Sequence, residues 1–198
     1  DKRSIELINL NNKRKEIEYS ILRSIDFDKI EKENKNIIFY YDPNINEGLL
    51  GIIASRLKDY FNKPTIVITN SQNLLKSSAR STYNYNIGRA VKKSLDQKII
   101  LNGGGHNMAA GFILKKSNLS VFENFIFKDY LKTNISLDSA LNYDFQVSSS
   151  ILNKNFFDDI RKIEPFGNEN PSPTFLFKEL KVIKTSIKKD KHISCILK

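Results

Sequence analysis

The sequence predicts an α/β fold in which a mixed sheet is flanked by helices. The main observation is a strand–helix–strand pattern over 37–69, where two short apolar runs bracket a segment with helical spacing. Helices and short apolar strands then alternate as far as about residue 134, and strand-rich sequence follows. We therefore expect a connecting helix over 1–34, an α/β domain over 35–134 and a truncated β domain over 135–198.

The first 33 residues are predicted to form one long helix. Ile17, Ile21 and Ile25 recur four residues apart, and lysine, glutamate and asparagine occupy the other face. No strand pattern interrupts this segment, so we expect it to join the chain to a preceding part of the protein.

Two buried strands and a helix follow. The apolar run 37–41 suits a buried strand, whereas 47–61 has the spacing of a helix that stops before Pro64. Residues 65–69 form a second apolar run, and a polar, partly extended segment covers 70–82. Short loops favour a parallel, right-handed crossover between the two strands.

The α/β domain is predicted to continue with two helices and two short strands. We expect a helix over 86–95 and a strand over 99–101 that leads into a glycine run. Residues 112–114 suit another strand, and Asn118 suits the N-cap of a helix that ends near residue 132. The predicted buried side of that helix consists of Leu119, Phe122, Phe125, Ile126 and Tyr130.

Beyond residue 135 the character of the sequence changes. Residues 137–147 resemble paired short strands, and 148–163 resemble one helix. A loop rich in proline, glycine and asparagine covers 164–173. The end of the chain alternates as strands, with a hairpin turn predicted over 188–191.

The positive charge has two explanations. The chain carries 32 lysine and arginine residues against 22 acidic residues, a formal net charge of +10. Such a surplus is typical of nucleic-acid-binding proteins, because these cations displace counterions from phosphates. A lysine-rich compositional bias explains the bulk charge about equally well. Arg56 and Arg80 are more informative, because arginine is scarce in this chain and both lie among small residues.

Other features of the composition narrow the class of protein. No run approaches the ~20 apolar residues that a membrane span needs. The single Cys195 excludes an internal disulfide framework and a cysteine metal cluster, which suits a reducing, cytoplasmic setting. Because the chain begins Asp1-Lys2-Arg3, without an initiator methionine, we expect it to be a piece of a longer polypeptide.

The glycine run at 103–105 is the most prominent candidate site. Three glycines after a strand allow positive φ angles and bring bare N–H groups close to an anion, and His106 beside them can donate to a phosphate oxygen. The alternative is a glycine-rich turn with a histidine that bonds only to backbone. No Gly-Lys-Ser/Thr follows, so this is not a nucleotide-binding P-loop.

Two further segments contain candidate phosphate contacts. Gly48, Gly51 and Ser55 share one face of the predicted helix and leave a groove with Arg56 beside it, although close helix–sheet packing also explains the glycines. Ser78, Arg80 and Ser81 belong to a hydroxyl-rich stretch that suits phosphate or sugar oxygens, although a solvated loop is the simpler explanation.

In combination and in this order, these motifs resemble the DHHA1 domain of the DHH phosphoesterases. The motifs are Gly-x-x-Gly-Ile-Ile-Ala-Ser-Arg-Leu at 48–57, Pro-Thr-Ile-Val-Ile at 64–68, Ser-Ala-Arg-Ser at 78–81 and Gly-Gly-Gly-His-x-Met-Ala-Ala-Gly-Phe at 103–112. The loop 165–175 resembles RecJ-type single-strand exonucleases at the point where their OB-fold domain begins, and residues 10–15 resemble the family's interdomain helix.

The resemblance implies the substrate-binding part of an enzyme that degrades single-stranded DNA from its 5′ end to mononucleotides, in repair and recombination. A two-metal Mn²⁺ or Mg²⁺ site would belong to the catalytic DHH domain, whose Asp-His-His motif this chain lacks, so we expect no metal site and no cleavage by this chain alone. Single-stranded DNA, and a helicase or a single-strand-binding protein, are the implied partners.

The resemblance also assigns roles to individual residues. Gly104, Gly105 and His106 would hold the scissile or terminal phosphate, with His106 the one candidate for a catalytic contact. Arg56, Ser78, Arg80 and Ser81 would clamp neighbouring phosphates. The sequence departs from the family at Ile45-Asn46, where a Trp-His pair is common, so a role for that histidine is not expected in this chain.

Three alternatives stay open at this point. The chain suits a stand-alone module that binds single-stranded nucleic acid, although its N-terminal helix needs something to pack against. It also suits a DHHA1-bearing phosphodiesterase acting on short oligonucleotides or cyclic dinucleotides, against which the Pro-Phe-Gly-Asn loop at 165–168 counts. Alanyl-tRNA synthetase carries a related domain, without such an OB-like continuation.

Overall fold

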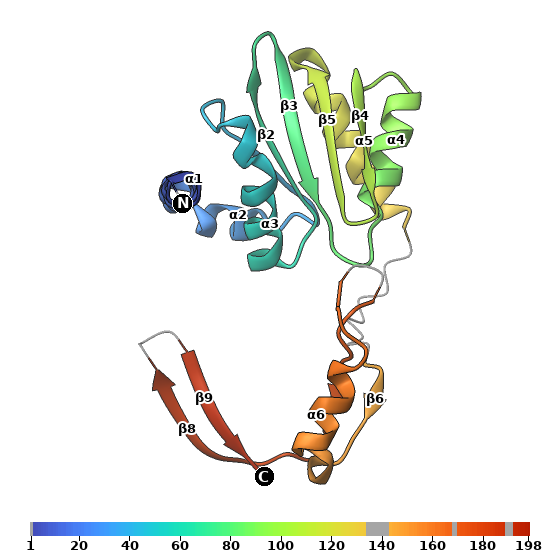
Figure 1. Ribbon diagram of the computed structural model, residues 1–198. Helices are drawn as coiled ribbons and strands as arrows, with labels where there is room; N and C mark the ends of the chain where they lie inside the picture. The colour runs from blue at the N-terminus through green and yellow to red at the C-terminus, as the bar shows by residue number, and fades with distance from the viewer. Residues whose placement is uncertain (1, 134–142, 168–169, 189–191) are drawn as a thin grey trace. The chain divides into compact units, whose positions relative to one another are not determined.

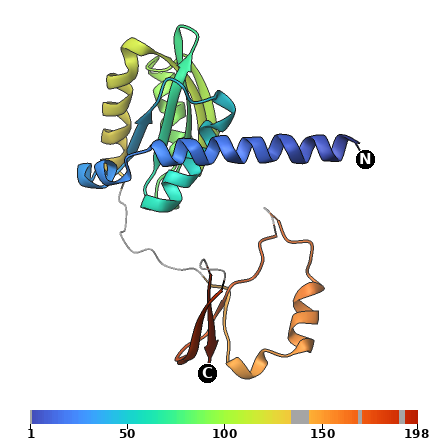
Figure 2. The same cartoon turned by 90° about the vertical axis from the view of Figure 1, so that its left-hand side faces the viewer.

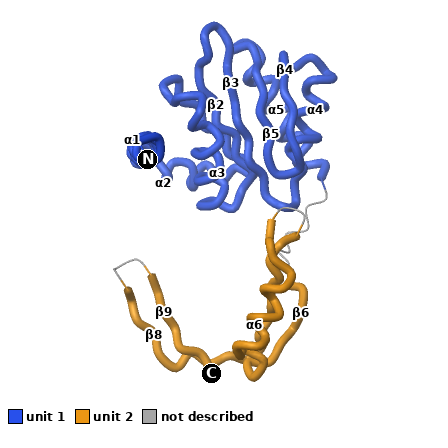
Figure 3. The backbone as a smooth tube through the Cα atoms, viewed as in Figure 1, with its two compact units in different colours: residues 1–137 blue, residues 138–198 orange. Residues whose placement is uncertain are grey.

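The computed structural model describes residues 2–133, 143–167, 170–188 and 192–198. The chain divides into unit 1, residues 1–137, and unit 2, residues 138–198 (Figure 3). None of the described helices has the length and apolar character needed to cross a membrane.

Unit 1 contains a mixed five-stranded sheet with helices on both faces, as the sequence predicts. The strand order is β1-β2-β3-β5-β4 (Figure 1). The strands are β1 Ile38–Tyr41, β2 Thr65–Ser71, β3 Leu74–Arg80, β4 Asn102–His106 and β5 Ala109–Lys115. The α-helices are α1 Lys2–Ser24, α2 Phe27–Glu33, α3 Leu50–Phe61, α4 Ile87–Asp96 and α5 Leu119–Leu131.

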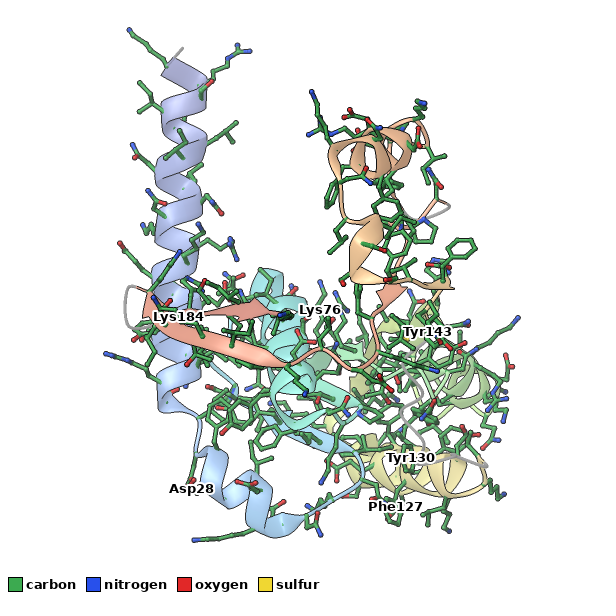
Figure 4. All side chains as sticks on the ribbon, turned by 90° about the horizontal axis from the view of Figure 1, so that it is seen from below. Asp28, Lys76, Phe127, Tyr130, Tyr143 and Lys184 are labelled. Atoms are coloured by element: carbon green, nitrogen blue, oxygen red, sulfur yellow. The ribbon has the colours of Figure 1, made fainter. Side chains whose placement is uncertain are left out.

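The prediction of one N-terminal helix over residues 1–33 is wrong, because the helix breaks between α1 and α2. Ile25 at the break is buried in the core beside α3. Asp26 then caps α2, since its carboxylate accepts a hydrogen bond of 2.9 Å from the Lys29 amide. The first turns of α1 extend beyond the rest of unit 1, with side chains on every side (Figures 2 and 4).

The strand–helix–strand prediction is confirmed. β1 pairs with β2 in parallel, with Ile38 opposite Thr65, and α3 lies between them in the chain. A short 3₁₀ turn, Glu47–Leu49, precedes α3. The polar segment after β2 turns back as β3, which pairs antiparallel with β2. Ser71 lies opposite Leu74 at one end of the pairing, and Thr65 lies opposite Arg80 at the other.

Two apolar clusters cover the two faces of the sheet unequally. α4 and α5 pack on the face of the sheet that is turned away from the viewer in Figure 1. They contact buried residues of β2, β3 and β5 such as Ile66, Ala79 and Phe112. On the other face, α3 packs against Val67 of β2. Leu57 of α3 is fully buried there. This second cluster contains no residue of β4 or β5 among those described.

The glycine run is a strand and not a bend. Residues 103–105 lie in the edge strand β4, and no described glycine has a positive φ. The predicted strand at 99–101 is therefore displaced to Asn102–His106. The glycines are needed for close packing: a Cβ at Gly103 would lie 2.6 Å from Cβ of Phe112, and one at Gly88 of α4 would lie 2.5 Å from the His106 carbonyl oxygen.

Asn118 precedes α5, as predicted, but does not cap it. A 3₁₀ turn over Lys116–Asn118 leads into the helix, and the Asn118 side chain makes no capping hydrogen bond. Its amide Nδ2 donates instead to the Ile99 carbonyl over 2.9 Å. The predicted buried side is confirmed, with Phe122 and Ile126 fully buried.

Unit 2 consists of short elements. β6 Phe145–Gln146 pairs in parallel with β7 Phe175–Leu176, and β8 Val182–Lys188 pairs antiparallel with β9 His192–Leu197. The predicted helix over 148–163 is wrong: a 3₁₀ turn, Ser149–Ile151, comes first, and α6, Lys154–Arg161, begins after Asn153, which caps it. Of the strands predicted over 137–147, residues 137–142 lie outside the described residues.

Candidate nucleic-acid interface

The predicted site residues fall on two rows across the sheet of unit 1. In the first row Arg80 of β3 pairs with Ala109 of β5, which pairs with His106 of β4. In the second row Ser78 pairs with Gly111, which pairs with Gly104. Residues opposite one another or two apart on neighbouring strands point to the same face. The side chains of Ser78, Arg80 and His106 therefore share one face with Gly104.

This shared face is the one that α3 covers only in part. α3 lies over β2 and β3, whereas Gly104, His106 and Gly111 are exposed. A Cβ at Gly104 would meet no atom within 4 Å. The result is a nearly bare backbone surface over β5 and β4, which we call the glycine platform: Gly104, His106, Ala109 and Gly111. Arg80 lies on the side of the glycine platform that is nearest to α3. It is two strand spacings, about 10 Å, from His106.

A groove between α3 and β3 adjoins the glycine platform. It has a volume of about 440 Å³ and we call it the arginine groove, after two of its lining residues: Gly48, Gly51, Ile52, Ser55, Arg56 and Arg80. Of the two glycines predicted to leave room on a helix, Gly51 lies in α3, whereas Gly48 lies in the 3₁₀ turn before it. A Cβ at Gly51 would lie 2.9 Å from Nη2 of Arg80 and 3.4 Å from Oγ of Ser78.

Arg80 lies in the arginine groove with neutral partners only. Its Nη1 donates to the Ala79 carbonyl over 2.9 Å and to Oγ of Ser78 over 3.3 Å. Within the described ranges no carboxylate forms an ion pair with Arg80. A half-buried, uncompensated guanidinium offers its remaining donors to an anion, and phosphate matches its fork geometry.

The Arg56 side chain is bound by a residue of α1. Its Nε donates to Oε1 of Glu18 on α1 over 2.8 Å, while 60% of the Arg56 side chain is exposed. Glu18 also accepts from Nη1 of Arg14 over 2.9 Å. The hydrogen bond from Arg56, with the charges of both arginines, lowers the pKa of Glu18 below its ordinary value despite burial. The carboxylate is therefore ionised at neutral pH.

Ser81 and Gly105 do not lie on this surface. The Ser81 hydroxyl is buried and donates over 2.6 Å to the carbonyl of Tyr85, so it stabilises the turn after β3 and has no surface for a phosphate. Burial and the nearby Asp129 carboxylate raise the pKa of Tyr85, whose hydroxyl donates to Asp129. Gly105 belongs to the face packed by α4: a Cβ there would contact the Ala109 carbonyl oxygen.

Two positions have roles that the sequence alone did not indicate. Asn46, where the family commonly has histidine, accepts a hydrogen bond of 2.9 Å from the Gly48 amide and so caps the turn before α3. Glu18 is the one described residue of α1 that is buried. The four-residue spacing of Arg14 and Glu18 indicates their pairing. Contact with Arg56, 38 positions away, has no such signal.

Replacing Gly51 with alanine separates the fit of the arginine groove from the stability of α3. Alanine favours a helix over glycine by up to ~1 kcal/mol, so we expect the melting temperature to stay equal or rise. The new methyl group displaces the Arg80 guanidinium, and affinity for a single-stranded oligonucleotide should fall about threefold. The control for fluorescence anisotropy is Gly167→Ala, whose methyl group would meet no atom within 4 Å and which does not line the arginine groove. Equal affinities would contradict this role of Gly51.

Family comparisons agree with this architecture. The model of the DHHA1 domain matches residues 34–132, half of the chain, and the model of the RecJ OB domain matches residues 143–198. The chain therefore belongs to the DHHA1 domain family.

Individual relatives named RecJ are similar to most of this chain. The chain is 30% identical over 183 residues to the single-stranded-DNA-specific exonuclease RecJ of Haemophilus influenzae, covering 87% of this chain and 32% of that protein. RecJ of Escherichia coli is 28% identical over 86% of this chain and 31% of its own length. The crystal structure of Thermus thermophilus RecJ with Mg²⁺ shares the fold, with a TM-score of 0.72 and 24% identity over 97% of this chain and 30% of that one. The chain thus spans about a third of these curated relatives.

Divalent metals accompany the solved RecJ structures, with Mg²⁺ in one and Mn²⁺ in another. The described residues of this chain do not fit such an ion, since they contain no group of three or more histidine, cysteine, aspartate or glutamate side chains able to hold a metal. His106 and His192 lie in separate units.

Proposed function

We propose that this chain is the substrate-binding part of a RecJ-type 5′–3′ exonuclease that degrades single-stranded DNA to mononucleotides in repair and recombination. Relatives that carry the name single-stranded-DNA-specific exonuclease support the substrate class. The single observation that carries the proposal is the uncompensated Arg80 guanidinium between the arginine groove and the glycine platform.

In this proposal phosphates of the strand follow the arginine groove and reach the glycine platform. Arg56, Ser78 and Arg80 contact successive phosphates, and His106 with Gly104 contacts the terminal or scissile phosphate. Gly104 is exposed and a Cβ there would meet no atom within 4 Å, so a phosphate can approach the bare backbone at this position. The burial of Ser81 and the packing of Gly105 leave these two out of the proposed contacts.

The division into a connecting helix over 1–34, a substrate-binding domain over 35–134 and an OB-like domain over 135–198 is part of the proposal. Exposed apolar side chains near the start of α1, including Ile5 and Leu10, support a connecting role, because they gain from contact with another part of the protein. The metal-bearing domain would supply the hydrolytic chemistry. A helicase or single-strand-binding protein as partner and a cytoplasmic location stay predictions from the sequence.

The proposal is tested by assaying the 198-residue chain with a labelled oligo-deoxythymidine. We expect binding that weakens steeply as salt rises, because phosphate contacts release counterions. We expect no cleavage when Mn²⁺ is added, since the described residues lack a metal site. Undetectable binding at low salt would overturn the proposed function, and cleavage by the chain alone would overturn its division of roles.

A further inference from the structure

We propose that Glu18 is a positioning residue, which holds the Arg56 guanidinium at the lip of the arginine groove and thereby links α1 to the bound strand. This inference rests on the proposed function. It adds a role for a residue that is distant in sequence from the groove motifs and lies on α1, a helix that contributes none of the groove's lining residues.

The geometry of the contact is the basis of the inference. Glu18 is 8% exposed and receives two arginine donors from different elements, Arg14 of α1 and Arg56 of α3. Arg56 spends only its Nε on the carboxylate, over 2.8 Å. No other hydrogen bond of the Arg56 side chain is present within the described ranges, so both of its terminal nitrogens are available to a phosphate.

An exposed arginine side chain binds a phosphate more tightly when another residue already restrains it. An unrestrained arginine loses about 2 kcal/mol of rotamer freedom when a ligand fixes it. Fixing Nε in advance aligns the plane of the guanidinium, so less freedom is lost when a phosphate binds. Since Glu18 has a lowered pKa, the restraint is present throughout the neutral range, and its partner Arg14 offsets the charge that the carboxylate brings near the DNA.

The sign of the effect separates positioning from simple electrostatics. A carboxylate near a polyanion repels it, so electrostatics alone predicts that removing Glu18 tightens DNA binding. Positioning predicts weaker binding. Glu16 lies two residues away on α1, is exposed and forms no ion pair within the described ranges, so Glu16→Ala and Glu16→Gln are matched controls with the same change of charge.

The test measures affinity of the 198-residue chain for a single-stranded oligonucleotide. We expect Glu18→Ala to weaken binding about fivefold, and Glu18→Gln to weaken it less, because the amide oxygen still accepts from Arg56. The two Glu16 variants should bind as tightly as wild type or slightly more tightly. In an Arg56→Gln background, Glu18→Ala should change affinity by less than about twofold, since the residue through which it acts is gone.

Thermal melts accompany the binding assay. A purely structural role predicts a lower melting temperature for Glu18→Ala with unchanged affinity, and this result would overturn the inference. Tighter binding by Glu18→Ala would also overturn it. If Arg56→Gln weakens binding while Glu18→Ala does not, the inference alone fails. If the wild-type chain binds no DNA, the proposed function itself fails.

Discussion

Replacing Arg80 with alanine is expected to weaken binding of single-stranded DNA about tenfold and to reduce the salt slope by ~0.7, the value for one lost phosphate contact on a single strand. The reason is local: Arg80 is the groove cation without an acidic partner among the described residues, so its charge is fully available to phosphate. Fluorescence anisotropy over a salt series measures both quantities.

The control for Arg80→Ala is Arg23→Ala. Arg23 is an exposed arginine of α1 that lies over the Tyr19 ring, 4.4 Å from its centroid, and it does not line the arginine groove. Both variants lose one positive charge, so a difference between them reports position and not net charge. Equal loss of affinity and slope in the two variants would contradict the assignment of Arg80. The Arg80 variant also loses two internal hydrogen bonds, so a melt checks that it is folded.

The largest effect on stability is expected from Gly105→Ala. The added methyl group would contact the Ala109 carbonyl oxygen and lie 2.5 Å from Cα and 2.6 Å from Cβ of Ala110. These are backbone and near-backbone atoms that cannot rotate away, so the strands must separate, at a cost on the order of 3 kcal/mol in the free energy of unfolding. Chemical denaturation followed by circular dichroism measures this cost.

Gly104→Ala is the matched control one residue earlier. Its methyl group would meet no atom within 4 Å, so the same substitution in the same strand should change stability by no more than about 0.5 kcal/mol. A similar loss in both variants would show that strand propensity, and not the close approach of β5, governs this segment. Because Gly104 is part of the glycine platform, its variant also shows whether a single methyl group there impedes DNA binding.

The alternation of helices and strands was predictable because burial leaves a clear periodic signal. β1, β2, α3 and α4 lie within a few residues of their predicted positions, since their apolar runs are short and bounded by polar residues. The break at Ile25 was not predictable, because Ile25 continues the helical spacing and is buried all the same. In the 148–163 segment, the helical pattern concealed the 3₁₀ turn Ser149–Ile151 that precedes α6.

The groove was predictable from its small residues, whereas the arrangement of the candidate site was not. The motif around Gly51 predicted a groove, and a groove is present there, but phosphate binding by these residues stays a prediction. Conformation was the weaker part: three glycines permit a bend, yet the closeness of Phe112 and Ala110 favours an extended strand. Ser81 and Gly105 adjoin true surface residues in sequence, but alternation along a strand directs neighbours to opposite faces.

The sparse side chains of the glycine platform limit how far this surface can recognise base sequence. Gly104, Ala109 and Gly111 project almost nothing toward a ligand, so little on this face reaches the edges of bases and discriminates A from C, G or T. Guanidinium groups bind the phosphates of a polynucleotide, which are the same at every nucleotide. Such a surface does not distinguish one base sequence from another, so the proposed binding of a single strand should be independent of its sequence.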